Sequence, residues 1–390
     1  MNKVLTVFKK EIKDAFRDRR TLISSILIPA LLIPVLFLLM GNSISGVQKS
    51  VKQEGFKVSF QGKNTYLEQF LSRQPYIKIV QSDNPQKMLQ DGKIQAIIVV
   101  PDDFNSAIEE GKQVDLSILY DQSSSKSSMG LASLTGAIDA FSKSIANERL
   151  KSKGIDPQLI YPVVTKVTDI AAKKNGEGAF VLSFIIPLFL MMWPAIGAMI
   201  SAADSGAGEK ERGTLEPLLA TQASRTAIAV GKWLAISIAS LTGAVAFTIG
   251  LIISLQINPM AFGGKIYISI LPITIMTILG VLVSLMYSAF MLALSIFARN
   301  TKEANTYMSP INIIAMVPAY LTFYTDIKSI PLWQYVIPFY NIVLVLKESL
   351  SGTVNIIHLG LAILGACILI LLALIVAIKM FNDEKVIFRN

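Results

Sequence analysis

Six long apolar runs constrain what this chain can fold into more than any other feature of its sequence. They occupy Leu22–Met40, Ala179–Ala203, Ala227–Leu255, Ile268–Ala298, Met308–Phe323 and Ile356–Met380. A helix needs roughly 20 predominantly apolar residues to cross the hydrocarbon core of a membrane. Hydrophobic residues make up 52% of the 390 residues and charged residues only 16%, which is too apolar for a soluble enzyme of this length. The sequence therefore predicts a membrane α-helical protein with about six transmembrane helices.

The first apolar run has two interpretations. Basic residues precede it, and Ser43-Ile44-Ser45 resembles the small-residue cleavage site of a secretory signal peptide. However, the run is long, contains Pro29 and Pro34, and is followed by further apolar runs. These features favour a retained transmembrane helix.

The positions of lysine and arginine predict the orientation in the membrane. These residues gather before the first run, between the second and third, between the fourth and fifth, and after the sixth: Lys3, Lys9, Lys10, Lys13, Arg17, Arg19, Arg20, Lys210, Arg212, Arg225, Arg299, Lys302, Lys385 and Arg389. Short cytoplasmic loops carry the excess of positive charge, so both termini are expected in the cytoplasm. The net charge of +9 needs no nucleic-acid partner, because no basic run is interleaved with stacking aromatic residues.

Outside the apolar runs, the chain divides into segments of different character. Residues 1–20 place Leu5, Phe8, Ile12 and Phe16 on one helical face and basic residues on the other, which predicts an interfacial elbow helix. A solvated basic tail is the alternative. The predicted boundaries are 21–41, 179–203, 227–255, 268–298, 306–324 and 356–380 for the transmembrane helices, 204–226 for a cytoplasmic coupling segment and 381–390 for a cytoplasmic tail.

Residues 42–178 form the one large polar stretch, which this topology places outside the cytoplasm. Short β-rich runs alternate there with helical patterns, so we predict an extracytoplasmic α/β domain inserted between helices 1 and 2. The expected strands lie near Phe56–Phe60, Tyr76–Val80, Ile94–Val100 and Val114–Tyr120, and the expected helices near Tyr66–Ser72, Pro85–Gln90 and Phe104–Glu110. A loop over Ser123–Ser128 should precede a long helix over Met129–Lys151.

Residues 325–355 contain two apolar pieces, Pro331–Ile337 and Phe339–Leu346, that are too short to cross a membrane and are separated by Pro338. They predict a re-entrant or interfacial segment at the outer leaflet. No internal repeat is visible in the sequence, so any two-fold symmetry requires a second copy of the chain.

The chain lacks the residues for catalysis or for holding a cofactor. No phosphate-binding G-x-x-x-x-G-K-[S/T] loop is present, since Gly62-Lys63-Asn64 and Gly231-Lys232-Trp233 both lack the hydroxyl residue. One cysteine, Cys367, and one histidine, His358, exclude an intramolecular disulfide and a Cys/His metal site. We interpret His358 as an interfacial residue at a helix start and Cys367 as a small residue facing lipid or another helix.

The coupling segment carries a distinctive pattern, Glu209-Lys-Glu-Arg-Gly-Thr-Leu-Glu-Pro-Leu-Leu219. Thr214 can cap the N-terminus of a short helix, and Glu216 and Pro217 suit its first turn. Leu215, Leu218 and Leu219 would then protrude from one face. Because so short a helix cannot bury three leucines alone, it requires a groove on a partner or the bilayer surface.

This pattern resembles that of the ABC-2 type permeases, and most closely the NatB-like permeases of bacterial sodium-extrusion pumps. Ser224-Arg225, Gly231-Lys232-Trp233, Lys9-Lys10-Glu11, Asp18-Arg19-Arg20-Thr21, Asp91-Gly92-Lys93 and Ala298-Arg299-Asn300 extend the resemblance over nearly the whole chain. It implies a type V exporter-like fold in a bacterial plasma membrane. It also implies that the short helix is a coupling helix that docks on a separate ATPase, which binds ATP and magnesium.

The resemblance assigns the ATPase contacts to Glu209, Glu211, Arg212, Gly213, Thr214, Leu215, Glu216, Leu218 and Leu219. The expected assembly is a homodimer with two ATPase subunits, exporting Na⁺. Oxygen atoms along a sodium path could come from Ser183, Ser201, Ser284, Ser288, Asn305, Ser309 and Asn312, although each also suits helix packing. Export of a drug, lipid or peptide, and a membrane-anchored surface receptor whose working part is residues 42–178, remain alternatives.

Overall fold

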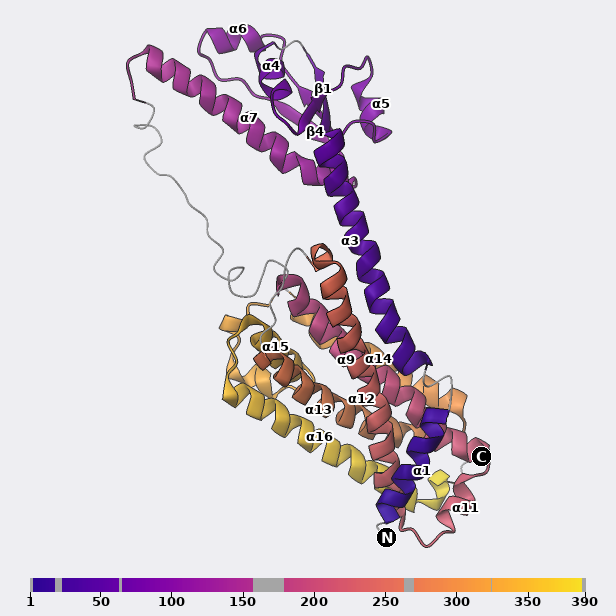
Figure 1. Cartoon of the computed structure of the whole chain (residues 1–390). Coiled ribbons are helices and arrows are strands. Elements are labelled where there is room, and N and C mark those ends of the chain that lie inside the picture. Colours follow the sequence, from indigo (N-terminus) through magenta and orange to yellow (C-terminus); the bar gives the residue numbers. More distant parts are fainter. Residues whose placement is uncertain are drawn as a thin grey trace. The chain divides into compact units, whose positions relative to one another are not determined.

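A computed structural model describes residues 3–17, 23–62, 65–156, 179–262, 270–323 and 325–387. The chain forms two units: Met1–Gly41 together with Asp169–Asn390, and Asn42–Thr168. The first is a helical bundle and the second an α/β unit (Figure 1). Helix α3 (Ile28–Glu54) contributes residues to both.

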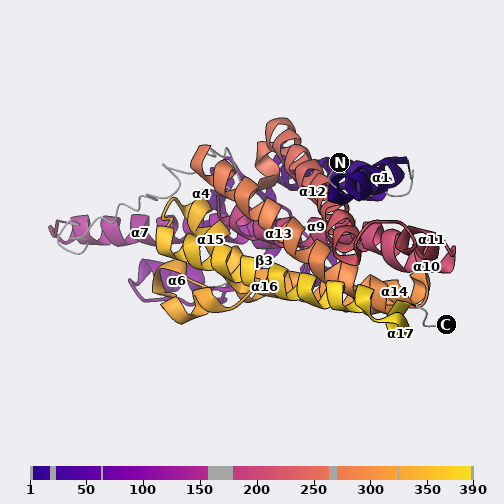
Figure 2. The same ribbon diagram turned by 90° about the horizontal axis from the view of Figure 1, so that it is seen from below.

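Long helices build the bundle: α9 (Ala179–Ala203), α12 (Arg225–Ile257), α13 (Ile270–Phe297), α14 (Thr301–Leu321) and α16 (Ile356–Asn382). Helix α9 packs against α12, α13 and α14, while α16 lies along α13, as the view from below shows (Figure 2). Small residues allow close packing. Hydroxyl groups also join the helices, since Ser240 donates to the Pro194 carbonyl at 2.7 Å.

In the part of the chain that the structure describes, four helices are long and apolar enough to cross a membrane: Leu182–Glu211, Arg225–Ile257, Ile270–Phe297 and Ile356–Asn382. The predicted first span corresponds to a shorter apolar helix, Ile28–Asn42, within the described residues. The predicted fifth span is the 21-residue helix α14, which contains Pro310 and Pro318. The six-helix count thus stays a prediction for these two helices.

The elbow segment is a helix, α1 (Lys3–Arg17), and the face that packs on the bundle differs from the apolar face that the sequence assigns to the membrane interface. Val7 and Glu11 are buried, whereas Leu5 and Phe16 are 46% and 40% exposed. A Cβ atom on Gly231 of α12 would lie 2.8 Å from the Val7 side chain, so glycine allows this close approach. One face of α1 therefore packs closely against α12, and the other carries exposed apolar residues suited to a lipid surface.

Between α14 and α16 the chain forms short elements: η5 (Ile327–Ser329), η6 (Leu332–Val336) and α15 (Tyr340–Ser351). The two predicted apolar pieces correspond to η6 and α15, and both are too short to cross a membrane. All residues from Asn341 to Ser349 of α15 are buried in the bundle. This unit also contains a π-helical turn, η1 (Ile23–Leu27), a 3₁₀ turn, η4 (Pro259–Phe262), and helix α17 (Glu384–Ile387).

The α/β unit has a four-stranded sheet in the order β2-β1-β3-β4. Strand β1 (Phe56–Gln61) pairs in parallel with β2 (Ile77–Ile79) and β3 (Ala96–Val99), and β3 pairs antiparallel with β4 (Ser117–Tyr120). Val58 lies opposite both Ile79 and Ala96 in these ladders. The strands lie where the β-rich runs predicted them.

Helices α4 (Tyr66–Ser72), α5 (Pro85–Gln90), α6 (Phe104–Glu109) and α7 (Ser125–Ser152) accompany the sheet. Phe70, Phe104 and Phe141 form an aromatic cluster in the core of this unit. The predicted loop over Ser123–Ser128 is too long, because Ser124 caps α7 by accepting a hydrogen bond from the Ser127 backbone. That this unit lies outside the cytoplasm stays a prediction.

Cysteine labelling would test the topology. In a Cys367→Ala background, Ser125→Cys should react with a membrane-impermeant maleimide added outside intact cells, and Gln222→Cys only after the membrane is opened. Both positions are exposed, and Gln222 avoids the serine that caps α12. The basic loops are the physical reason for the expected difference. Labelling of both cysteines from one side would contradict the predicted orientation.

Candidate functional site: the coupling segment and its ion cluster

The coupling segment is a series of short helical turns between α9 and α12. It comprises a π-helical turn, η3 (Asp204–Gly208), α10 (Glu209–Glu211) and α11 (Leu215–Leu219). Helix α10 ends because Gly213 adopts a φ of 69°, which favours glycine. The Thr214 backbone then donates to the Glu209 carbonyl at 2.9 Å. This turn redirects the chain into α11.

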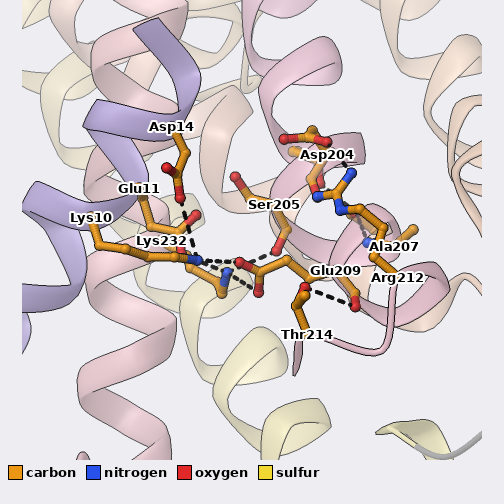
Figure 3. Close-up of polar contacts among 12 residues, drawn as sticks. Lys10, Glu11, Asp14, Asp204, Ser205, Ala207, Glu209, Arg212, Thr214 and Lys232 are labelled. Carbon is orange, nitrogen blue, oxygen red and sulfur yellow. Dashed lines mark hydrogen bonds and ion pairs between the residues drawn. The ribbon is translucent and has the colours of Figure 1, made fainter. Parts of the chain in front are cut away.

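A buried lysine of α12 lies at the centre of the site. Lys232 has no exposed surface, and its ammonium group donates to Glu11 Oε1 at 2.8 Å, Glu209 Oε2 at 2.6 Å and the Ser205 carbonyl at 2.9 Å. All three donor positions of the ammonium are therefore used. Figure 3 shows Lys232 between Glu11 of α1 and Glu209 of the coupling segment.

Lys10 completes the cluster from the elbow helix. It donates to Glu11 Oε1 at 2.9 Å and to Glu209 Oε1, and it lies 3.7 Å from Asp14 Oδ2. Glu11 and Glu209 are only 3% and 4% exposed, so each carboxylate needs these cations. We call Lys10, Glu11, Glu209 and Lys232 the ion cluster. It joins α1, the coupling segment and α12.

The charges within the ion cluster reinforce one another. Burial alone would raise the pKa of Glu11, but the charges of Lys232 and Lys10 and their hydrogen bonds hold it below its ordinary value. Burial alone would lower the pKa of Lys10, but the hydrogen bond to Glu209 and the charge of Glu11 outweigh burial and raise it. Both groups are therefore ionised at neutral pH.

The other charged residues of the motif also bind within the same chain. Lys210 donates to the carbonyls of Ile296, Ala298 and Val386, where a cation suits the C-terminal end of α13. Glu211 accepts from the backbone and hydroxyl groups of Thr301 at 3.1 and 2.7 Å. These contacts fasten the segment to the ends of α13 and α14.

Arg212 donates to Asp204 Oδ1 at 2.7 Å, across the π-helical turn. Ser295 of α13 bridges the same turn, since its hydroxyl donates to the Ala202 carbonyl and accepts from the Ala207 backbone at 2.9 Å. The turn thus keeps its backbone groups paired although the helix is interrupted. A polar cavity of about 300 Å³ beside the ion cluster is lined by Asp14, Ser201, Asp204 and Arg212, among others.

Helix α11 differs from its prediction in two respects. Thr214 occupies the N-cap position of α11, as predicted, but its side chain makes no capping hydrogen bond; the Thr214 hydroxyl donates to the Glu209 carbonyl at 3.3 Å instead. Leu215 is only 2% exposed and belongs to the core of the bundle, so the three leucines do not protrude together. Leu218 and Leu219 are half-buried, while Gly213, Thr214 and Glu216 are exposed.

The residues suggested for a sodium path lie on three helices, α9, α13 and α14. Ser183 is half-buried in α9, and the Asn312 amide of α14 contacts Met199 Sδ at 2.8 Å. Hydrogen bonds link Ser288 to the Ser284 carbonyl and Ser309 to the Asn305 carbonyl, in each case within one helix. These bonds favour a role in helix packing. In the described part of the chain, no group of three or more His, Cys, Asp or Glu side chains could hold a metal ion.

The sequence contained one signal for the ion cluster. Lys232 is a lysine close to the start of a long apolar run, and a charge in such a place requires a partner. Nothing in the pattern indicated that the partners would be Glu11 and Glu209, 221 and 23 residues away.

Removing the central cation should destabilise the bundle. Lys232→Met leaves two buried carboxylates with only Lys10 to neutralise them, so we expect a loss of about 3–5 kcal/mol in the free energy of unfolding. The measurement is unfolding of the purified protein in mixed micelles. Lys302→Met, at an exposed position, is the matched control and should change little.

The double variant Glu11→Gln/Lys232→Met isolates the role of charge. It leaves one carboxylate, Glu209, opposite one cation, Lys10, so it should be more stable than Lys232→Met alone. A double variant that is less stable than the single one would contradict charge balance as the cause.

Comparison with known proteins agrees with this architecture. The family described as ABC-2 family transporter protein matches residues 19–378. The ABC transporter permease protein NatB of Bacillus subtilis (strain 168) is 29% identical over 356 residues, covering 90% of each chain. The uncharacterized protein MJ1024 of Methanocaldococcus jannaschii is 24% identical over 333 residues, covering 82% of this chain and 75% of that protein. The chain belongs to the ABC-2 transporter family and is a membrane permease subunit.

Proposed function

We propose that this ABC-2 permease exports sodium ions, using energy from a separate ATPase that docks on α11. The observation that carries the docking proposal is that the two parts of the coupling segment make different contacts. Glu209, Lys210, Glu211 and Arg212 all bind within the permease, whereas Glu216, Leu218 and Leu219 offer surface to a partner.

The contacts that hold the coupling segment in place suit α11 to transmit force from a partner to the bundle. A partner that pushes on α11 acts on the coupling segment, which is fixed to α1 and α12 by the ion cluster and to α13 and α14 by Lys210 and Glu211. Force would therefore reach several helices at once rather than bend one short helix. We propose that two ATPase subunits act in this way on a homodimer of the permease, because a single chain has no internal repeat to supply two-fold symmetry.

Sodium is the substrate that the resemblance to NatB-like permeases implies. The 29% identity to NatB over 90% of both chains supports this choice. Sodium-22 efflux from vesicles that contain the permease and its ATPase tests it. We expect ATP-dependent efflux that disappears when either subunit is omitted. Efflux at the same rate without ATP would contradict the proposal.

Two substitutions on α11 test docking. Leu218→Asp places a carboxylate where an apolar groove of the ATPase would bury it, at a cost of several kcal/mol, and each ~1.4 kcal/mol is a tenfold loss of affinity. Because Leu218 also packs partly on the bundle, Glu216→Lys serves as a second variant at an exposed position. Both should lose co-purification with the ATPase while keeping a normal gel-filtration profile.

Lys153→Glu is the control, a charge reversal at an exposed position of the α/β unit. It should leave the co-purification unchanged. Full binding and export by both α11 variants would show that α11 is not the docking site.

A further inference from the structure

A second buried polar cluster joins three elements between α14 and α16. Glu348 of α15 is 3% exposed and accepts hydrogen bonds from the Tyr335 hydroxyl of η6 and, at 3.3 Å, from the Asn355 backbone. His358 Nδ1 of α16 lies 2.6 Å from Glu348 Oε1. The imidazole also stacks on the Tyr335 ring at 3.7 Å between centroids. We call these three side chains the histidine cluster.

The histidine cluster lies at the opposite end of α16 from the coupling segment. Arg225, which follows α11, donates to the carbonyls of Phe381 and Asn382 at the C-terminal end of α16. His358 is in the first turn of the same 27-residue helix. With a rise of about 1.5 Å per residue, roughly 35 Å separates His358 from Phe381. If α11 is cytoplasmic, as proposed, His358 faces the outer aqueous phase.

Few charged groups compete for Glu348. Its neighbour Lys347 is directed elsewhere, donating to the Thr322 carbonyl at the end of α14. Helix α13 carries one titratable residue, Tyr287, which stacks on Phe339, and the basic residues of α12, Arg225 and Lys232, lie at the coupling end. Tyr340 is the remaining titratable residue of α15. Helix α14 carries Lys302, Glu303, Tyr307 and Tyr320, and η5 carries Lys328. Among the described residues, Tyr335 and His358 are the titratable side chains that bond to the Glu348 carboxylate.

We propose that Glu348 and His358 form a proton-binding site that latches α15 to α16 when the outer solution becomes acidic. His358 is the only histidine of the chain, and its side chain is 18% exposed, so water can reach it. An ionised carboxylate only accepts hydrogen bonds, so Nδ1, which faces Glu348, carries the hydrogen of the neutral imidazole. An added proton therefore binds at Nε2. The uncharged imidazole becomes an imidazolium, and its hydrogen bond to the carboxylate becomes an ion pair.

The latch would hold the turn between α15 and α16. Gly352 ends α15 in the left-handed conformation, and the Thr353 backbone donates to the Glu348 carbonyl at 3.0 Å. Together with the Asn355 bond, this folds the turn around Glu348. Protonation tightens the turn, and loss of the proton loosens it, so the outer end of the permease responds to pH independently of the ATPase.

Hydrogen–deuterium exchange on the purified full-length permease tests the latch without any transport assay. A charge-assisted hydrogen bond is about twice as strong as a neutral one. After correction for intrinsic exchange rates, the amides of Thr353 and Asn355 should therefore be roughly fivefold better protected at pH 5.5 than at pH 7.5. His358→Gln keeps a donor near Glu348 but cannot titrate, and should remove this pH dependence.

Tyr335→Phe is the matched control, because it keeps the ring stacked on His358 and removes only the hydroxyl. It should lower protection at both pH values and retain the pH dependence. Equal protection of the wild-type protein at both pH values would overturn the latch, as would a His358→Gln profile that follows the wild type. Neither result would affect the sodium-efflux test, so the two proposals can fail separately.

Discussion

The arrangement of α1, α12 and the coupling segment depends on the buried ion cluster. Lys232 carries a full charge into the bundle, and that charge is tolerable only because Glu11 and Glu209 meet it within hydrogen-bond distance. The requirement fixes the position of α1 on α12 and the position of the coupling segment beside both. It also explains why α1 buries Val7 and Glu11 instead of its more apolar face. A polar constraint, not apolar burial alone, selects the face that packs.

This constraint changes the meaning of the motif that carries the family resemblance. From the sequence alone, the alternating charges of Glu209–Arg212 indicate a surface for a charged partner. In the structure these side chains bind partners within the permease. Lys210 and Glu211 bond to the ends of α13 and α14, and Arg212 bonds to Asp204 across the π-helical turn. The proposed docking surface for the ATPase is then the short stretch that follows. Its orientation is specified by the motif, while its chemistry is carried by Glu216, Leu218 and Leu219.

Local patterns predicted local structure well. The β-rich runs correspond to β1–β4, and the apolar runs correspond to α9, α12, α13 and α16, because periodicity and length depend on neighbouring residues only. The predictions that failed concern choices between competing partners. Thr214 lies at the N-cap position of α11, but its hydroxyl bonds to the Glu209 carbonyl instead of capping the helix. Leu215 could face a partner, but the bundle buries it. Contacts such as Glu11 with Lys232 join distant segments and leave no periodic signal.

The two polar clusters differ in a way that bears on how a permease of this kind can move. The ion cluster balances two lysines against two carboxylates and joins α1, the coupling segment and α12, so it is suited to hold these elements together. The histidine cluster instead depends on a group whose ordinary titration range lies near neutral pH, and it closes a turn rather than a helix–helix interface. Under the two proposals, force from an ATPase acts at the ion cluster, and the pH of the outer solution acts separately on the turn between α15 and α16.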